Sequence, residues 1–270
     1  MMSTLSAARP VRAAARAAAA CLALIALPAM AQQPHTLDVP YVPTPNAVVQ
    51  AMLDLADVQP DDYLIDLGSG DGRIAIAAVQ ERKARGALGV DIDADRIAEA
   101  RANARNARVA DRVEFRRQDL FKTDFSEASV LTMYLLPDVN MRLRPIILEK
   151  LPAGTRVVSH AFDMRDWEPD VTRDIDGRRA YLWIVPAKVD GNWRVSAPDG
   201  GFALKLEQTF QHVQGIATLQ DRQVAISDGR LRGDRLHFSL DGKQYVGKVG
   251  SSGIEALSAD GAVIDWSARR

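Results

Sequence analysis

Cysteine is nearly absent from this sequence, which holds a single one, Cys21, in 270 residues. Because Cys21 falls in an N-terminal stretch that we expect to be removed, the processed chain has no disulfide, no thiolate metal site and no cysteine nucleophile. The four histidines, His35, His160, His212 and His237, do not have metal-ligand spacing. The composition therefore argues against a metal centre and against cysteine chemistry.

A basic excess is missing as well. The chain carries 34 basic and 35 acidic residues, and removing residues 1–31, which hold three arginines and no acids, brings the formal charge from −1 to −4. This distribution lacks the basic footprint of a nucleic-acid-binding protein, so we expect no nucleic-acid partner. With 47% hydrophobic and 26% charged residues, the chain has the composition of a globular protein that buries a core.

The first 31 residues lack a hydrophobic run long enough to cross a bilayer, which takes about 20 residues. Three arginines precede an apolar run over 17–27, and Ala29-Met30-Ala31 follows it. This pattern is typical of a secretory signal peptide cleaved after Ala31. We therefore expect an exported, periplasmic protein without a membrane-spanning segment. An uncleaved N-terminal membrane anchor and an organelle transit peptide are the alternatives.

One short segment joins a buried strand to a glycine-rich turn. Residues 63–67 are apolar except for Asp66, as expected of a parallel strand covered on both faces, and residues 68–72 read Gly-Ser-Gly-Asp-Gly. Alternating glycines let the backbone turn tightly and let a ligand approach it. Residues 74–80 predict a helix whose N-terminus faces the same point. A tight turn without a ligand is the alternative interpretation.

The spacing of the glycines in this loop distinguishes between two candidate ligands. A dinucleotide fingerprint, G-x-G-x-x-G, requires glycine three positions after Gly70, where the chain has Arg73. The carboxylates of Asp66 and Asp71 would also repel a pyrophosphate. They favour an adenosyl ligand that lacks phosphate and carries its own ammonium and sulfonium, which describes S-adenosylmethionine. NAD-dependent oxidoreduction is therefore disfavoured.

Two further acids follow predicted strands. Residues 87–91 predict a strand that ends at Asp91, 25 residues after Asp66, where an acid can accept hydrogen bonds from both ribose hydroxyls. The next strand leads to Asp119, which can accept from an adenine amino group, although taken alone Asp119 is equally a turn residue. Because parallel strands end at one edge of a sheet, we expect the cofactor-binding residues to meet there. In the strands and loop they are Asp66, Gly68, Ser69, Gly70, Gly72, Asp91 and Asp119.

Alternating strands and helices continue beyond these acids. A strand over 129–136 brings Tyr134 and Pro137 to the place where a second substrate would meet the cofactor. The helical stretch that follows contains Pro145, which predicts that a second helix starts there.

A further strand and a hairpin complete this part of the chain. We expect the strand over 155–160, and the hairpin from residues 171–175 and 180–185, joined by Asp176-Gly177. The pattern predicts an α/β fold, a seven-stranded Rossmann-like methyltransferase sheet, over residues 32–187.

The pattern changes at Pro186. Residues 188–270 contain short alternating segments separated by Asp-Gly pairs, with no helical period. This predicts a small, separable all-β domain, an antiparallel meander that forms a small barrel or a sandwich. His212 and His237 are interpreted as ordinary strand residues, so no chemistry is assigned to this domain.

Residues 38–186 resemble class I S-adenosylmethionine-dependent methyltransferases. More narrowly, they resemble bacterial relatives of the protein-lysine methyltransferases that act on the ATP synthase c subunit and the adenine nucleotide translocase. Three segments carry the narrower match: Pro40-Tyr41-Val42-Pro43-Thr44-Pro45, Asp66-Leu67-Gly68-Ser69-Gly70-Asp71-Gly72-Arg73 and Trp167-Glu168-Pro169-Asp170. Residues 131–137 are similar to the bacterial branch, differ from the animal enzymes, and lack the Asn-Pro-Pro-Tyr motif of amino methylation on bases and glutamine.

The resemblance implies S-adenosylmethionine as cofactor and a protein lysine or another amine as methyl acceptor. Tyr134 and Pro137 would then bound the acceptor slot, with ordinary strand packing as the alternative for Tyr134. Thr44, in the proline-rich segment, would bind the cofactor if that segment folds over it; a rigid linker is the alternative. Two other functions stay open. They are an exported binding protein whose methyltransferase fold is not used for catalysis, because this cofactor is made in the cytoplasm, and a methyltransferase that acts on a small molecule.

Overall fold

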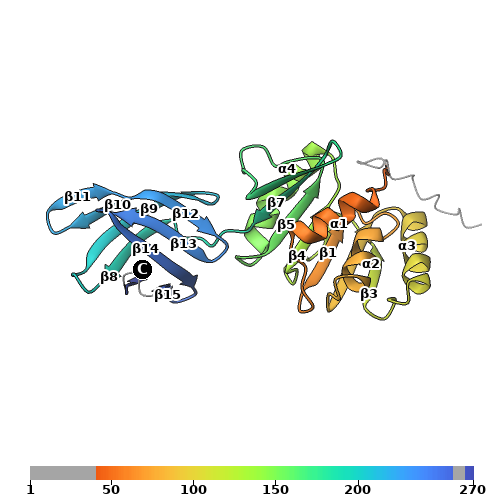
Figure 1. The fold of residues 1–270 in the computed structure, drawn as a ribbon, viewed down its shortest axis with the longest axis horizontal. Helices are drawn as coiled ribbons and strands as arrows, with labels where there is room; N and C mark the ends of the chain where they lie inside the picture. The colour runs from red at the N-terminus through yellow and green to blue at the C-terminus, as the bar shows by residue number, and fades with distance from the viewer. Residues whose placement is uncertain (1–40, 258–264) are drawn as a thin grey trace, which may run out of the picture. The chain divides into compact units, whose positions relative to one another are not determined.

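The first sheet contains seven strands: β1 (Tyr63–Leu67), β2 (Gly86–Asp91), β3 (Val113–Arg117), β4 (Val130–Met133), β5 (Arg156–His160), β6 (Val171–Ile175) and β7 (Arg178–Ile184). They run in the order β3-β2-β1-β4-β5-β7-β6. The computed structural model describes residues 41–257 and 265–270, so the predicted signal segment, 1–31, lies outside the described residues (Figure 1). Strands β3 to β5 of this order pair in parallel, and β7 is antiparallel to both its neighbours.

Strand order reverses between β1 and β4, because β2 and β3 lie on one side of β1 and the later strands lie on the other. In open α/β sheets this switch point is where ligands bind, beyond the carboxyl ends of the strands. The glycine-rich loop follows β1 at this point. The fold therefore places the loop where a cofactor site is expected.

Helices cover both faces of the sheet, which explains why its central strands are mostly apolar, with Asp66 and Thr132 as buried polar exceptions. They are α1 (Asn46–Leu55), α2 (Arg73–Gln80), α3 (Ala94–Asn106) and α4 (Pro137–Lys150), and a 3-10 turn, η1 (Leu120–Lys122), follows β3. Leu64 of β1 packs in one core with residues of α1, α2 and α3, whereas its neighbour Ile65 packs in the other core with residues of α4. Successive side chains of a strand point to opposite faces, so a doubly covered strand needs apolar residues at both.

The prediction that Pro145 starts a second helix was wrong, because Pro145 lies inside the single helix α4. Leu143 and Ile147, one turn apart on this helix, are both fully buried. A proline inside a helix removes one backbone hydrogen bond. Packing of the same face on either side of Pro145 offsets this loss and keeps the two halves in one helix.

The predicted hairpin closes the sheet. Asp176 and Gly177 connect β6 to β7 and have φ angles of 51° and 78°. Positive φ at both central residues is the requirement of a two-residue type I′ turn, which Asp-Gly satisfies. The hairpin prediction is confirmed.

The second sheet closes into a barrel. The β9–β10 pairing joins its ends, so that eight strands form the ring and β11 pairs on the outside with β10. Its strands are β8 (Gly191–Ser196), β9 (Phe202–Thr209), β10 (His212–Leu219), β11 (Arg222–Ala225), β12 (Ser227–Arg232), β13 (Arg235–Leu240), β14 (Lys243–Gly250), β15 (Gly253–Ala256) and β16 (Ser267–Arg269). Of the two predicted forms, barrel and sandwich, the structure shows the barrel.

Aromatic side chains fill the barrel interior. The rings of Phe238 and Tyr245 stack at 4.9 Å between centroids, and Trp266 meets each of them edge-on at 5.6 Å.

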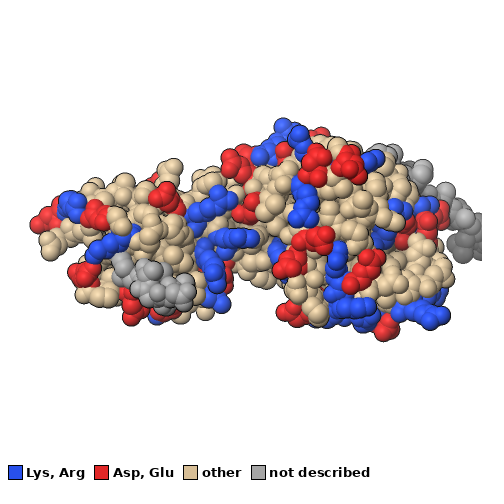
Figure 2. All heavy atoms as spheres, in the orientation of Figure 1, with Lys and Arg blue, Asp and Glu red and all other residues tan. Residues whose placement is uncertain are grey.

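Basic and acidic side chains are interspersed over the face of the protein drawn in Figure 2, in keeping with the near-neutral formal charge. Within residues 41–257 and 265–270, no helix combines the length and apolar character that a bilayer crossing requires.

Candidate cofactor and acceptor site

The glycine-rich loop depends on glycine at two positions for reasons of space as well as conformation. Gly70 and Gly72 have φ angles of 52° and 82°, in the left-handed region. A Cβ on Gly70 would lie 2.5 Å from the Tyr41 ring, and one on Gly72 would lie 2.4 Å from the Phe115 ring. Larger residues here would therefore strain the turn and displace the side chains that pack on it.

Asp66 carries a buried oxygen that no described residue satisfies. Its side chain is 1% exposed. Oδ1 accepts a 2.7 Å hydrogen bond from the Thr132 hydroxyl, while Oδ2 has no partner among the described residues. Burial raises the pKa of Asp66 to about 7, against the lowering effect of the Thr132 hydrogen bond. A cationic donor from a ligand would complete this carboxylate.

Ser69 shows the same feature inside the loop, since its buried Oγ has no partner among the residues that the structure describes. Orphaned polar atoms are rare in protein interiors because each one costs free energy. Two of them, at Asp66 and in the loop that follows it, fit a polar ligand at this edge of the sheet. These two oxygens can accept hydrogen bonds from the ammonium-bearing end of S-adenosylmethionine.

Asp91 is tied to the glycine-rich loop. Its Oδ2 accepts from the backbone N–H of Gly70 at 2.9 Å, and its Oδ1 accepts from that of Asp93 at 3.0 Å. Asp93 in turn caps α3, where it accepts from two backbone N–H groups of the first turn. Asp91 is thus held beside the loop with lone pairs left for a ligand, as a ribose-binding acid requires.

Asp119 lies beside Asp91, because the backbone N–H of Gln118 donates to the Asp91 carbonyl at 2.9 Å. Its Oδ1 accepts from the backbone N–H of Phe121 at 2.9 Å and so caps the turn η1. The two interpretations of Asp119 are therefore compatible. It is a turn residue, and the turn presents it at the cofactor edge.

Arg73, which stands where the dinucleotide fingerprint requires glycine, connects the glycine-rich loop to Thr44 through hydrogen bonds. Its guanidinium donates to both carboxylate oxygens of Asp71, with Nε 2.9 Å from Oδ1, and its Nη1 donates to the Thr44 carbonyl at 2.8 Å. Burial raises the pKa of Asp71, but the hydrogen bonds and charge of Arg73 lower it further than burial raises it. The carboxylate of Asp71 is therefore committed to Arg73 instead of to a ligand.

The segment 41–45 packs on the loop and is not a free linker. Thr44 is 4% exposed, and its hydroxyl lies 3.2 Å from Nδ1 of His160. The guanidinium of Arg96 stacks 4.6 Å from the centre of the Tyr41 ring, which itself contacts Gly70. The Thr44 hydroxyl, which we predicted at the cofactor, thus has a partner in the protein.

Aromatic rings gather where β4 and β5 end. Tyr134 follows β4, and its ring lies 4.0 Å from that of His160, the last residue of β5, and 6.4 Å from that of Phe162. His160 is 2% exposed; burial, together with the charge of Arg178, lowers its pKa to about 4. The imidazole is therefore neutral near pH 7. Pro137 begins α4 just beyond Tyr134.

His160 and Phe162 were not among the predicted site residues. His160 was interpreted as one of four scattered histidines, although it ends a predicted strand of the same parallel sheet. Asn140 was not predicted either; it is a fully buried residue whose amide nitrogen donates to the carbonyl of Phe162 at 3.2 Å. Asn140 thereby ties the start of α4 to the segment after β5.

This open α/β sheet, with a glycine-rich loop and acids at its carboxyl edge, is the architecture of class I methyltransferases. A family model described as the ANTKMT methyltransferase domain matches residues 66–171. A protein-lysine N-methyltransferase of Saccharolobus islandicus is 44% identical over 160 residues, which cover 98% of that protein and 58% of this chain. The adenine nucleotide translocase lysine N-methyltransferase of Mus musculus is 35% identical over 147 residues, 63% of that protein and 54% of this chain.

Among solved structures, an RNA methyltransferase from Salinibacter ruber in complex with S-adenosyl-L-homocysteine is 55% identical. The match has a TM-score of 0.54 and covers 96% of that chain and 55% of this one. This chain therefore belongs to the S-adenosylmethionine-dependent methyltransferases, in the family of the Saccharolobus islandicus enzyme. S-adenosylmethionine is its cofactor, and the resemblance found in the sequence is confirmed.

Proposed function

We propose that the protein transfers the methyl group of S-adenosylmethionine to the side-chain amine of a protein lysine. The observation that carries this proposal is the 44% identity to nearly the whole of a protein-lysine N-methyltransferase. Matches to lysine N-methyltransferases named for the adenine nucleotide translocase and for the c subunit of ATP synthase support the same acceptor class.

A lysine amine must be neutral to act as the nucleophile, yet its pKa in water is about 10.4. The cofactor supplies an electrophilic methyl group on a sulfonium. The amine lone pair forms the new N–C bond while the C–S bond breaks and its electron pair stays on sulfur. The protein's contribution is to align the amine with the methyl group, to exclude water, and to favour the deprotonated amine by desolvation.

We assign the wall of the acceptor slot to Tyr134, with Pro137 as its other boundary. Tyr134 follows β4, the strand paired with β1 on the side away from β2, and is half-buried. The face of a tyrosine ring attracts cationic groups, while its hydroxyl can donate or accept a hydrogen bond. The ring would therefore hold the amine near the sulfonium.

His160 extends this wall with a ring that carries no charge near pH 7. Its lowered pKa of about 4 matters because a protonated imidazole would repel both the sulfonium and an approaching ammonium. The Thr44 hydroxyl is hydrogen-bonded to Nδ1 of His160, and Nε2 of His160 has no hydrogen bond within the described residues. We assign to His160 the positioning of Tyr134, whose ring it contacts at 4.0 Å.

Mass spectrometry of cell-envelope extract incubated with the purified protein and isotope-labelled cofactor tests the acceptor. We expect label on lysine side chains of one or a few proteins, and none with Tyr134→Ala. Label found only on small molecules or carboxylates would reject the lysine acceptor and leave the methyltransferase assignment standing. Tight cofactor binding without turnover on any fraction would favour a binding protein.

RNA is the second candidate acceptor, because the solved relative at 55% identity is named an RNA methyltransferase. The same labelling reaction distinguishes the two classes when it is followed by separate ribonuclease and protease digestion. Label that is released as methylated nucleosides would replace the lysine proposal.

We also propose that the protein is exported and cleaved after Ala31. The support is that three arginines precede an apolar run within residues 1–31 and that the Ala29-Met30-Ala31 tripeptide follows this run. Expression of the full gene in a Gram-negative host, followed by N-terminal sequencing of the periplasmic fraction, should give a chain that begins at Gln32. An uncleaved chain that fractionates with the membrane would point to an N-terminal anchor, and an uncleaved chain in the cytoplasm would contradict export.

A further inference from the structure

A second concave surface lies at the opposite edge of the α/β sheet from the cofactor loop. The first residues of strands β1, β2 and β3 line this surface: Tyr63, Gly86 and Val113. Its volume is about 700 Å³, within the range of roughly 300–1,000 Å³ typical of small-ligand sites. Because the glycine-rich loop follows the other end of β1, a ligand in this cleft would not overlap the cofactor.

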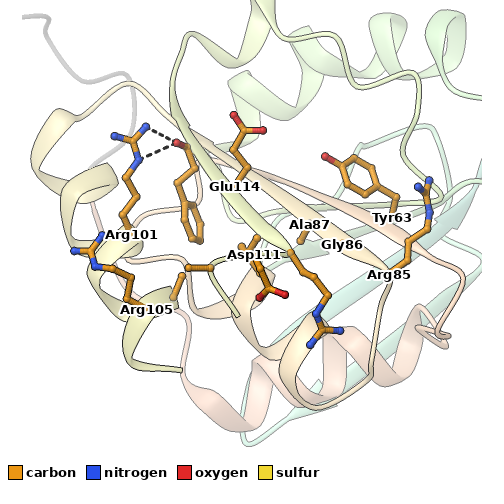
Figure 3. Close-up of a pocket in the computed structure, with 13 residues that line it drawn as sticks. Tyr63, Arg85, Gly86, Ala87, Arg101, Arg105, Asp111 and Glu114 are labelled. Carbon is orange, nitrogen blue, oxygen red and sulfur yellow. Dashed lines mark hydrogen bonds between the residues drawn. The ribbon is translucent and has the colours of Figure 1, made fainter. Parts of the chain in front are cut away.

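Four arginines line the cleft. Arg101 and Arg105, one turn apart on α3, lie on one side of it, and Arg85 lies with Tyr63 on the other (Figure 3). Arg112, which directly precedes β3, completes the set. The residues come from one helix and two loops that the sheet brings together, so the sequence alone does not show them as a cluster.

The acids of the cleft do not balance this charge. Asp111 and Glu114 are the acids that line it, and Glu114 is paired with Arg116, with 2.5 Å between Nη2 and Oε2. The lining therefore carries an excess of positive charge, which is unfavourable unless an anion compensates it.

Two of the arginines are held in place by hydrogen bonds to neutral carbonyl groups, not by ion pairs. Arg101 donates from Nε and Nη2 to the carbonyl of Phe115, at 3.1 and 2.6 Å, as the dashed lines in Figure 3 show. Arg85 donates to the carbonyl of Asp61 at 3.1 Å and stacks 5.0 Å from the centre of the Tyr63 ring. Their remaining N–H donors are therefore oriented before any ligand binds.

Arg105 and Arg112 supply the free donors. Within residues 41–257 and 265–270, the side chain of neither has a hydrogen bond or an ion pair with another residue. A guanidinium presents a fork of donors that matches the oxygens of phosphate and carboxylate groups. Several forks around one cavity require more acceptor oxygens than a single carboxylate provides, and a phosphate group meets this requirement.

We propose that this cleft binds an anion that carries phosphate groups, either a free phosphate compound or a phospholipid headgroup. The ligand would bind through bidentate contacts to Arg105 and Arg112, with Arg85 and Arg101 adding fixed donors. The site is independent of the methyl acceptor, so it stands whether or not the acceptor is a lysine.

Calorimetric titration of the whole protein with tripolyphosphate, at low and at raised salt, tests the soluble ligand. We expect saturable binding that weakens with salt, and a double variant, Arg105→Gln with Arg112→Gln, that binds about 10- to 100-fold more weakly because two charge-assisted contacts are lost. The matched control removes two exposed arginines outside the cleft, Arg173→Gln with Arg194→Gln, and should bind as the unaltered protein does. Unchanged affinity for S-adenosylhomocysteine in both doubles would show that they fold.

Sedimentation with vesicles identifies the source of the phosphate. Retention on phosphatidylglycerol vesicles but not on phosphatidylcholine vesicles, lost in the cleft double variant, assigns a headgroup; binding of tripolyphosphate without retention assigns a free phosphate compound. The proposal is overturned if the unaltered protein binds neither probe saturably up to roughly 10 mM, a dissociation constant too weak to matter. Equal weakening in the control double, or binding to an RNA oligonucleotide alone, would overturn it as well.

Discussion

The α/β sheet and the barrel bury their polar atoms differently. At the carboxyl edge of the sheet, Asp66 Oδ2 and Ser69 Oγ are buried without partners in the described part of the chain. Inside the barrel, the indole N–H of Trp193 donates to the Val189 carbonyl at 2.7 Å and that of Trp266 to the Val246 carbonyl at 3.1 Å. The sheet therefore leaves two buried polar atoms together at its ligand edge, whereas these two indoles of the barrel are paired within the protein; among the described barrel residues, Gln211 Oε1 is buried without a partner, away from that edge.

The same contrast holds for shape. In the sheet, glycines keep the loop open, whereas in the barrel Phe238, Tyr245 and Trp266 fill the space between the strands. A closed barrel with a filled interior has no room for a small molecule between its strands. Substitutions at the sheet edge should therefore change binding and turnover, and removal of the barrel should change stability alone.

The largest effect is expected from Tyr134→Ala. If Tyr134 forms the wall of the acceptor slot as proposed, loss of the ring should lower kcat about 100-fold or more while the affinity for S-adenosylmethionine changes by less than about twofold. Steady-state kinetics on the labelled acceptor, together with calorimetric titration of the cofactor, measures both. Tyr134→Phe is the matched control and should cost about threefold, since the ring face remains. A parallel loss of cofactor affinity in the alanine variant would show that Tyr134 instead supports the cofactor.

Asp91→Ala should weaken cofactor binding by about 1.5–3 kcal/mol, because two ribose hydroxyls lose a charged acceptor. Calorimetric titration gives the dissociation constant directly. Asp93→Ala is the control, since it removes the cap of α3 and should lower the free energy of unfolding by about 1 kcal/mol with little change in affinity. An unchanged dissociation constant for Asp91→Ala would refute its assignment to the ribose.

The pKa of Asp66 predicts two opposite pH dependences. Because burial raises its pKa from 3.8 to about 7, the folded protein binds more protons than the unfolded chain between these values. The contribution of Asp66 to the stability of the cofactor-free protein is therefore lost as pH rises through about 7.

Cofactor affinity should move the other way, because the ammonium of S-adenosylmethionine prefers the carboxylate. We expect it to rise about 10-fold from roughly pH 6 to pH 8, since the ionised fraction of a carboxyl with a pKa of about 7 rises from about one tenth to about nine tenths over this range. Titrations across this range in two buffers with different ionisation enthalpies would also detect the released proton. Asp66→Asn should abolish the pH dependence of the cofactor affinity. If the affinity of this variant still rises with pH, another group is responsible for the dependence.

The smallest effect on binding is expected from deletion of residues 188–270. The truncated chain should bind S-adenosylhomocysteine within about threefold of the full chain, because no residue of the barrel bonds to the glycine-rich loop within the described ranges. Its thermal midpoint should fall, since Phe210 stacks on Trp167 at 5.9 Å and Gln211 donates to the Glu168 carbonyl at 2.8 Å.

Phe210→Ala in the full chain isolates this contact and should lower the free energy of unfolding by about 1–3 kcal/mol. A truncated chain that is folded but binds no cofactor would show that the barrel is an integral part of the catalytic body. In that case the contrast between the two sheets would not correspond to a division of roles.

Local patterns predicted most of the fold and the identity of the cofactor. The apolar run ending at Leu67, the alternating glycines and the Asp-Gly turn at 176–177 each specify a conformation within a few residues. Pro145 was the exception, because its local preference for a helix start was overridden by burial of Leu143 and Ile147 against the sheet.

The acceptor half was only partly visible. Tyr134 was predicted to lie at the acceptor slot because it follows a predicted strand, but its neighbours His160 and Phe162 belong to the next strand and the loop after it. No periodicity or motif links these residues, since parallel strands pair only after a helix has brought them together. A rule that examines every residue at the end of a parallel strand would have found His160.

The sequence by itself determined the chemistry of the cofactor site, because the backbone geometry of the loop and the acids at the strand ends depend on residues close together in the chain. Only the tertiary structure decided which polar groups are left for a ligand. Asp71 is neutralised by Arg73, while Thr44 and His160, 116 positions apart, bond to each other. The cleft lined by four arginines likewise forms only once α3 lies against β3. Burial and long-range pairing set the pKa values and the free hydrogen-bond donors, and neither can be calculated from neighbours in sequence.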